Sequence, residues 1–153
     1  MKIAASSSVR ADRDRVFAAL LDPEVLQRCI PGCESLTPTG PDAYKATLKI
    51  GVAGLKGTYG GTVSIRDRRQ PESMTLVFDG KGGPGFVRGS AVITLVSELP
   101  ITRAVCDTDV HIGGVIAAVG SRLVEAAAKK LVEDFFARLS DELEHKTSIR
   151  RET

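Results

Sequence analysis

Residues that bind metals, form disulfides or stack on bases are scarce in this sequence of 153 residues. It contains no tryptophan, two histidines and three cysteines, and aromatic residues make up 5% of the chain. Cys29 and Cys33 are separated by three residues, a spacing that is neither CxxC nor part of a four-ligand set. We therefore expect no metal site, and we expect the cysteines to be small buried apolar residues.

Long apolar runs and dense charge of one sign are also missing. No segment reaches the roughly 18 apolar residues that cross a bilayer, and Met1–Val9 lacks the apolar core of a secretion signal. The net charge is +2, and no cluster of lysine and arginine is dense enough to predict nucleic-acid binding. These absences favour one cytoplasmic domain over residues 1–144, followed by a polar tail over residues 145–153.

The clearest positive feature is an amphipathic segment near the C-terminus. Apolar side chains recur there at intervals of four residues, at Leu123, Ala127, Leu131, Phe135 and Leu139. This period predicts a helix over Val115–Leu143, about 44 Å long at 1.5 Å per residue. A helix of this length needs a large apolar surface across from it.

The segments before this helix predict the sheet that supplies that surface. Lys2–Val9 alternates weakly and predicts a first strand, and Asp12 and Asp22 are candidate N-caps of two short helices. From Cys33 to Ile112 the apolar period falls to two, which is typical of antiparallel strands with one apolar and one wet face. The order predicts an α+β domain in which a strongly curved antiparallel sheet wraps the long C-terminal helix.

Glycines gather in the predicted sheet, and they allow two interpretations. Twelve of the fifteen lie between Gly51 and Gly114, and Gly57, Gly61 and Gly89 fall on the apolar face of their strands. They could serve only to let the sheet curl around the helix. Alternatively, the sheet curls and also leaves an apolar cavity, whose few polar or polarisable groups would be Tyr59, Cys106 and Thr108.

Candidate catalytic patterns are weak. Gly80–Gly85 matches GxGxxG, but a strand rather than a helix follows, which favours a hairpin at a pocket rim over a dinucleotide site. Cys106 and His111 are five residues apart in a strand and therefore face opposite ways. Asp107 and Asp109 share a face, but it is the predicted wet face. No group of these residues indicates a catalytic site.

Motifs along most of the chain resemble the CoxG family, whose members are accessory proteins of carbon monoxide dehydrogenase. The segments that carry the resemblance are Pro23–Leu26, Cys29–Glu34, Lys56–Gly61, Gly80–Gly82, Gly85–Phe86, Gly113–Gly114, Gly120–Leu123 and Phe135–Phe136. It extends over roughly Lys2 to Leu143. The resemblance implies a helix-grip, START-like fold of the SRPBCC superfamily, in which a curved antiparallel sheet holds a long C-terminal helix around an apolar cavity.

The resemblance also implies a partner and a ligand. Members of the family accompany molybdenum hydroxylases of the carbon monoxide dehydrogenase type, as accessory or membrane-recruiting factors or as carriers of a hydrophobic quinone. It supplies no agreed catalytic residues and no covalent cofactor. Some relatives have a C-terminal extension suited to membrane attachment, whereas Glu144–Thr153 is short and polar. We therefore expect brief contact with the inner face of a membrane at most.

Three functional hypotheses follow. The first is a non-catalytic carrier of an apolar ligand, with a respiratory quinone as the best guess and with Tyr59 and Thr108 contacting its headgroup. The expected ligand-binding residues are Tyr59, Gly61, Phe78, Thr108, Val110, Ile112, Val119 and Leu123. The second is an assembly or membrane-recruitment factor that has a filled core and acts through its surface. The third is an enzyme that uses Tyr59, Asp107 or His111 as acid or base.

Overall fold

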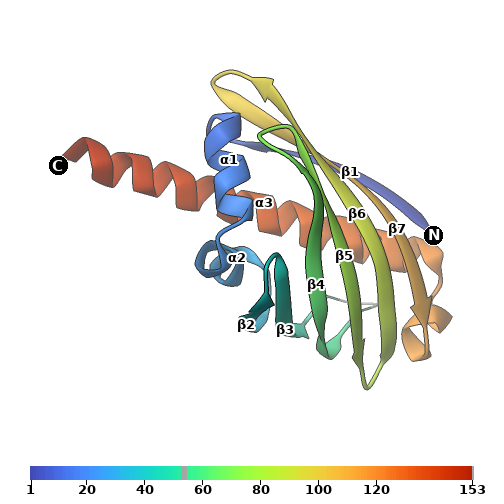
Figure 1. Cartoon of the computed structure of the whole chain (residues 1–153). Coiled ribbons are helices and arrows are strands. Elements are labelled where there is room, and N and C mark those ends of the chain that lie inside the picture. Colours follow the sequence, from blue (N-terminus) through green and yellow to red (C-terminus); the bar gives the residue numbers. More distant parts are fainter. Residues whose placement is uncertain (53–54, 153) are drawn as a thin grey trace.

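The computed structural model of the chain describes residues 1–52 and 55–152, with side chains as far as residue 144. In order, the elements are β1 (Lys2–Val9), α1 (Arg13–Leu20), α2 (Pro23–Cys29), β2 (Cys33–Gly40), β3 (Ala43–Ile50), β4 (Gly57–Arg69), β5 (Ser73–Gly82), β6 (Gly85–Glu98), β7 (Ile101–Gly113), the 3-10 helix η1 (Val115–Val119) and α3 (Ser121–Glu152). The predicted fold class is confirmed: a curved antiparallel sheet wraps a long C-terminal helix, and two short helices follow the first strand (Figure 1).

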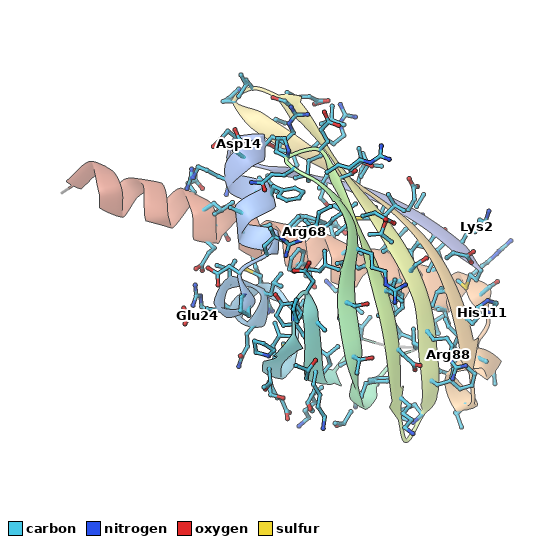
Figure 2. All side chains as sticks on the ribbon, viewed as in Figure 1. Lys2, Asp14, Glu24, Arg68, Arg88 and His111 are labelled. Atoms are coloured by element: carbon cyan, nitrogen blue, oxygen red, sulfur yellow. The ribbon has the colours of Figure 1, made fainter. Side chains whose placement is uncertain are left out.

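The described strands form a single sheet in the order β1-β7-β6-β5-β4-β3-β2, and every neighbouring pair is antiparallel. The faces of the sheet follow the predicted alternation. On β7, Cys106 and Val110 are buried on the concave face, whereas Asp107, Asp109 and His111 are exposed on the other. Side chains such as Arg88, which pairs in register with His111, project from this outer face (Figure 2).

The two short helices begin close to their predicted caps. Asp22 accepts a hydrogen bond from the backbone N–H of Glu24 at 3.0 Å, and Pro23 occupies the first helical position of α2. Asp12 stands at the N-cap position of α1 but makes no capping hydrogen bond with its side chain. Both helices lie beside the second half of α3, which extends beyond them toward the C-terminus (Figure 1).

The prediction of one continuous helix from Val115 was wrong at its start. Residues Val115–Val119 form η1, and α3 begins only at Ser121. Gly114 (φ 84°) and Gly120 (φ 98°) flank η1 in conformations that side chains with a Cβ rarely adopt. The break therefore lies in backbone torsions that an apolar period does not reveal.

At its other end, α3 continues to Glu152 through most of the predicted polar tail. The side chains of residues 145–153 lie outside the described residues. Within the described part of the chain, no helix is both long and apolar enough to cross a membrane.

Two apolar clusters lie at opposite ends of the interface between α3 and the sheet. The packed end, beside α1 and α2, is centred on Phe17, Met74, Leu95, Phe136 and Leu139. The hollow end contains the smaller cluster Leu55, Tyr59, Ile116, Val124 and Ala127. Helix α3 packs on the sheet mainly through β1, at one edge, so the strands farther across curve around it at a distance.

Candidate ligand-binding cavity

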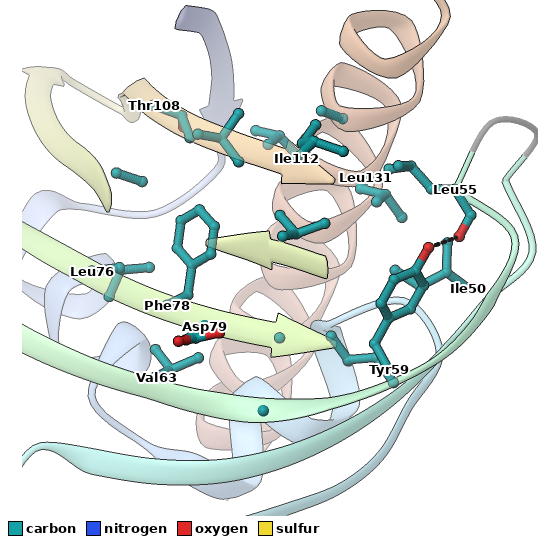
Figure 3. Close-up of a pocket in the computed structure, with 18 of the residues that line it drawn as sticks. Ile50, Leu55, Tyr59, Val63, Leu76, Phe78, Asp79, Thr108, Ile112 and Leu131 are labelled. Atoms are coloured by element: carbon teal, nitrogen blue, oxygen red, sulfur yellow. Dashed lines mark hydrogen bonds between the residues drawn. The ribbon is translucent and has the colours of Figure 1, made fainter. Parts of the chain in front are cut away.

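An apolar cavity of about 380 Å³ lies between the concave face of the sheet and α3 (Figure 3). Its volume falls within the range of small-molecule sites. Strands β1, β3, β4, β5, β6 and β7 all contribute to the wall, and α3 contributes Val124, Ala128, Leu131 and Val132. Because this lining is almost entirely apolar, the cavity suits a ligand that is itself mostly apolar.

Six of the eight residues predicted to bind a ligand line this cavity. They are Tyr59, Gly61, Phe78, Thr108, Val110 and Ile112. The structure brings them together from β4, β5 and β7, because alternate residues of each strand face the concave side. Contact between any of them and a ligand stays a prediction.

Val119 and Leu123 lie outside the cavity, which corrects their expected place in its wall. Their side chains are 41% and 43% exposed. Gly120 interrupts the helix between them and changes the direction of the chain, so the apolar side of α3 starts at Val124. Val124 is buried, one position beyond the predicted Leu123.

The glycines on the apolar face of the sheet were one reason to expect a cavity, but the structure gives them a different role. A Cβ placed on Gly61 would collide with the carbonyl oxygen of Asp79, and one placed on Gly89 would collide with that of Asp109. These glycines therefore allow close approach of neighbouring backbones in a strongly bent sheet. Of the two interpretations, curvature together with a cavity is the one that the structure supports, although backbone occupies the Cβ positions of Gly61 and Gly89.

The open volume instead accompanies small side chains that the prediction did not name. Ala46 on β3, Ala91 on β6 and Ala128 on α3 all line the cavity. Their spacing in the sequence was the available signal. Ala91 lies two residues from both Gly89 and Ile93 and so shares their inward face of the strand, and Ala128 lies one helical turn after Val124. Where three elements each present a methyl group, the interior stays open.

Besides Thr62 and Asp79, the described part of the cavity lining has three side chains with polar or polarisable groups, Tyr59, Cys106 and Thr108. The Tyr59 hydroxyl donates to the carbonyl oxygen of Leu55 at 2.7 Å, and burial raises its pKa. Burial, with a smaller contribution from the charge of Asp107, raises the pKa of the Cys106 thiol to about 12. The Thr108 hydroxyl makes no hydrogen bond to the residues described, so it has a donor available for a ligand.

The hollow end is closed where three separate segments meet. Leu55 belongs to the segment between β3 and β4, Pro84 lies in the β5–β6 turn, and Ile116 lies in η1. Ile116 packs with Leu55 and Tyr59, and its backbone N–H donates to the carbonyl of Pro84 at 2.9 Å. Beside this closure, a second cavity of about 260 Å³ lies between η1, the start of α3 and the end of β7.

The remaining candidates for chemistry lie apart from the cavity. Asp107, Asp109 and His111 are exposed on the outer face of the sheet and do not line the main cavity, although His111 borders the second one. Among the described residues, no group of three or more potential metal ligands is present. The segment Gly80–Gly85 joins two strands, as predicted, and has no helix after it to bind a pyrophosphate.

Comparison with known proteins connects this geometry to a family. Residues 6–144 match the family model of CoxG, a component of carbon monoxide dehydrogenase. A conserved protein of solved structure from Geobacillus kaustophilus is 35% identical, with a TM-score of 0.90 over 95% of this chain and 96% of that one. None of the curated protein sequences matches the chain.

Two more distant solved structures share the fold. A START superfamily protein from Mycobacterium smegmatis is 13% identical, with a TM-score of 0.72 over 94% of this chain and 97% of that one. The ZhuI aromatase/cyclase from a Streptomyces species is 15% identical, with a TM-score of 0.67 over 96% and 95% of the two chains. The START-like architecture thus occurs in both an enzyme and a protein whose name specifies no activity.

Proposed function

Because the chain belongs to the CoxG family of carbon monoxide dehydrogenase components, we propose that it is a non-catalytic accessory protein that carries an apolar ligand, a respiratory quinone, for a molybdenum hydroxylase of the carbon monoxide dehydrogenase type. The observation that supports this proposal is the apolar cavity of about 380 Å³ between sheet and helix. Burial contributes about 25 cal/mol per Å² of apolar surface, so such a wall binds a mostly hydrocarbon ligand without many polar contacts.

The size of the cavity limits how much of a quinone it can enclose. A cavity of about 380 Å³ is near the lower end of the range for small-molecule sites, so we expect it to enclose a quinone ring with about one or two isoprenoid units. The rest of a long tail would lie beyond the cavity. In this arrangement Thr108 donates to a ring carbonyl, and Phe78 packs against the ring.

The polar groups on the wall favour binding over catalysis. The only donor of the Tyr59 hydroxyl is already engaged by Leu55. With a pKa of about 12, the Cys106 thiol is protonated near neutral pH and is a poor nucleophile. The sequence-based acid and base candidates Asp107 and His111 are exposed on the opposite face of the sheet.

A matched pair of helix variants tests the proposal. Ala128 lines the cavity, whereas Ala126, two positions earlier on α3, is exposed. We expect Ala128→Leu to weaken binding of ubiquinone-2 by about tenfold or more, which corresponds to about 1.4 kcal/mol, and Ala126→Leu to leave it unchanged. Fluorescence titration and native mass spectrometry measure this. No uptake by the parent protein, or equal affinities of the two variants, would refute the carrier.

Gly61 is unsuited to this test, although it lines the cavity. A side chain there would collide with the backbone of β5 and disturb the sheet as well as the volume. A substitution on α3 changes the cavity without touching a strand pair.

The alternative is an assembly or membrane-recruitment factor that acts through its surface. The open interior argues against the filled core that this alternative supposes. Restored hydroxylase activity in cells that express the Ala128→Leu variant would favour it over the carrier. Lost activity, with normal capture of the hydroxylase by the same variant, would favour the carrier acting at the inner face of the membrane.

A further inference from the structure

Three segments far apart in the sequence converge at the hollow end to form one surface. They are residues 55–58, 80–88 and 113–124, called here the tip. A Cβ on Gly57 would collide with the ring of Pro84, the carbonyl of Pro84 accepts from Ile116, and Ile116 packs with Leu55. The tip lies at the end of the molecule opposite the C-terminus (Figure 1).

The tip exposes large apolar side chains within a short stretch of chain. Val115 is 71% exposed, and Val119 and Leu123 are 41% and 43% exposed. They account for three of the seven large apolar side chains that are exposed in the described part of the chain, within nine consecutive residues. Exposed apolar groups concentrated in this way mark a contact surface more often than scattered ones do.

The charge of the tip has one sign. Its ranges contain Lys56, Lys81, Arg88 and Arg122 and no aspartate or glutamate, so the tip carries +4. The whole chain carries +2, which leaves −2 for all other residues. Lys56, Lys81 and Arg122 are exposed and form no ion pair with the residues described, while Arg88 lies 3.9 Å from Asp79.

We propose that the tip is a docking surface for an anionic lipid bilayer. Its three apolar side chains would enter the boundary between headgroups and acyl chains, and its cations would meet the acidic headgroups. This inference rests on the proposed function, because a carrier of a membrane-soluble quinone has to meet the membrane. The tip adjoins the cavity, since Leu55 lines the cavity and packs with Ile116 of η1.

The composition of the tip fits a bilayer better than a protein partner. Stable protein interfaces are built around aromatic and arginine anchors in shaped, well-packed pockets. The exposed large apolar groups of the tip are aliphatic side chains of η1 and the first turn of α3. Its one aromatic side chain, Phe86, is partly buried, and the Arg88 guanidinium lies 4.9 Å from the ring centroid. A bilayer surface accepts such groups without shape complementarity. Its acidic headgroups complement the positive charge of the tip, because Asp79 lies 3.9 Å from Arg88 but Lys56, Lys81 and Arg122 form no ion pair with the residues described.

Vesicle binding by the full chain tests the proposal. The probes are vesicles of phosphatidylcholine alone and of phosphatidylcholine with phosphatidylglycerol, assayed by co-sedimentation. We expect binding to the anionic vesicles only, at least tenfold weaker in the double variant Val115→Asp/Leu123→Asp. The matched control is Val92→Asp/Val96→Asp, because these valines are also 41% exposed but lie on β6 outside the tip. Equal loss in both, or no binding by the parent protein, would overturn the proposal.

Charge variants separate electrostatic attraction from apolar insertion. Replacing Lys56, Lys81 and Arg122 with glutamine should weaken binding to anionic vesicles severalfold and flatten its dependence on salt. Unchanged salt dependence would overturn the role of these cations. Normal vesicle binding by both sets of tip variants, with lost capture of the hydroxylase, would reassign the tip to a protein interface.

Membrane docking through the tip and quinone binding in the cavity can fail independently, and two variants distinguish the two outcomes. The Val115→Asp/Leu123→Asp variant should bind ubiquinone-2 in solution as the parent does, since neither side chain lines the cavity. The Ala128→Leu variant should bind vesicles normally. If the parent protein takes up no quinone but docks through the tip, the carrier fails and the docking surface stands.

Discussion

The two ends of one helix–sheet interface are filled very differently, although the same elements form both. At the packed end α3 presents Phe135 and Phe136, whose rings meet edge to face at 4.9 Å, and Phe136 is 2% exposed. At the hollow end the same helix presents Ala127 and Ala128 beside a cavity of about 380 Å³. Over about two and a half turns of α3, the inward side chains change from alanine beside the cavity to phenylalanine in the packed core.

Hydrogen bonds between α3 and the N-terminal elements also distinguish the two ends. Near the packed end, Arg15 donates to the carbonyl of Leu143 at 2.7 Å, Arg28 donates to Glu142 at 3.0 Å, and Ser140 accepts from the backbone of Arg10 at 2.9 Å. These bonds join α1, α2 and the end of β1 to the second half of α3. The closure at the hollow end depends on apolar packing and on the hydrogen bonds of Tyr59 and Ile116. One end is built for stability, and the other leaves room.

The largest expected difference lies between two phenylalanines. Phe136→Ala should lower the free energy of unfolding by about 3–5 kcal/mol, because it opens a new cavity in a filled core. Phe78→Ala should cost about 1–2 kcal/mol, because Phe78 is only partly buried and already faces open volume. Urea denaturation of the ligand-free protein measures both. Equal losses would mean that the two ends are packed alike.

Enlarging an alanine should have effects that differ between the two ends. Ala104 is fully buried in the packed cluster, so Ala104→Leu should overpack it and cost about 1–3 kcal/mol. Ala91 is on the neighbouring strand and lines the cavity, so Ala91→Leu should be neutral or slightly stabilising. Thermal and urea unfolding measure stability, and a quinone titration should show that only Ala91→Leu also weakens binding. A comparable destabilisation by Ala91→Leu would argue against open space there.

Cys106, which belongs to the packed cluster but also lines the cavity, tests whether water reaches the cavity wall. Its thiol has a pKa near 9 when unfolded and about 12 when folded, mainly because of burial. Between these values the unfolded state loses its proton first, so stability should fall as pH rises above 9, by up to about 1.4 kcal/mol per pH unit. Cys106→Ala should flatten this decline, and Cys33→Ala, at a partly exposed thiol, should flatten it less. An unchanged pH profile in Cys106→Ala would indicate that water reaches the thiol.

The sequence revealed the faces of elements better than their backbone geometry. Alternation in β4, β5 and β7 placed Tyr59, Phe78 and Thr108 correctly on the concave side, because the period of a strand determines which way a side chain points. The break at Gly120 was missed because apolar residues continue on both sides of it. The spacing of apolar residues does not reveal the backbone torsion angles. That break is the reason Leu123 was placed wrongly.

The glycines show a second limit of the sequence. A glycine on the apolar face predicts that a side chain is absent, but not what takes its place. At Gly61 the backbone of β5 occupies the position, whereas the open volume lies beside Ala91 and Ala128. Distinguishing these cases needs the path of the neighbouring strand, which is set by the curvature of the whole sheet.

The smallest expected effect concerns the length of a ligand's tail, and it sets a limit on the hollow end. If the cavity encloses a quinone ring and about one or two isoprenoid units, affinity should rise severalfold between ubiquinone homologues with one and two units. From two to four units it should change by less than about threefold, because the added carbons find no further cavity wall to pack against. Competition titrations at one detergent concentration measure the series, and an isoprenoid alcohol of each length controls for adsorption to the exposed Val115 and Leu123. A steady gain with every added unit would show that the interior opens further around a ligand, and that the closure made by Leu55 and Ile116 moves.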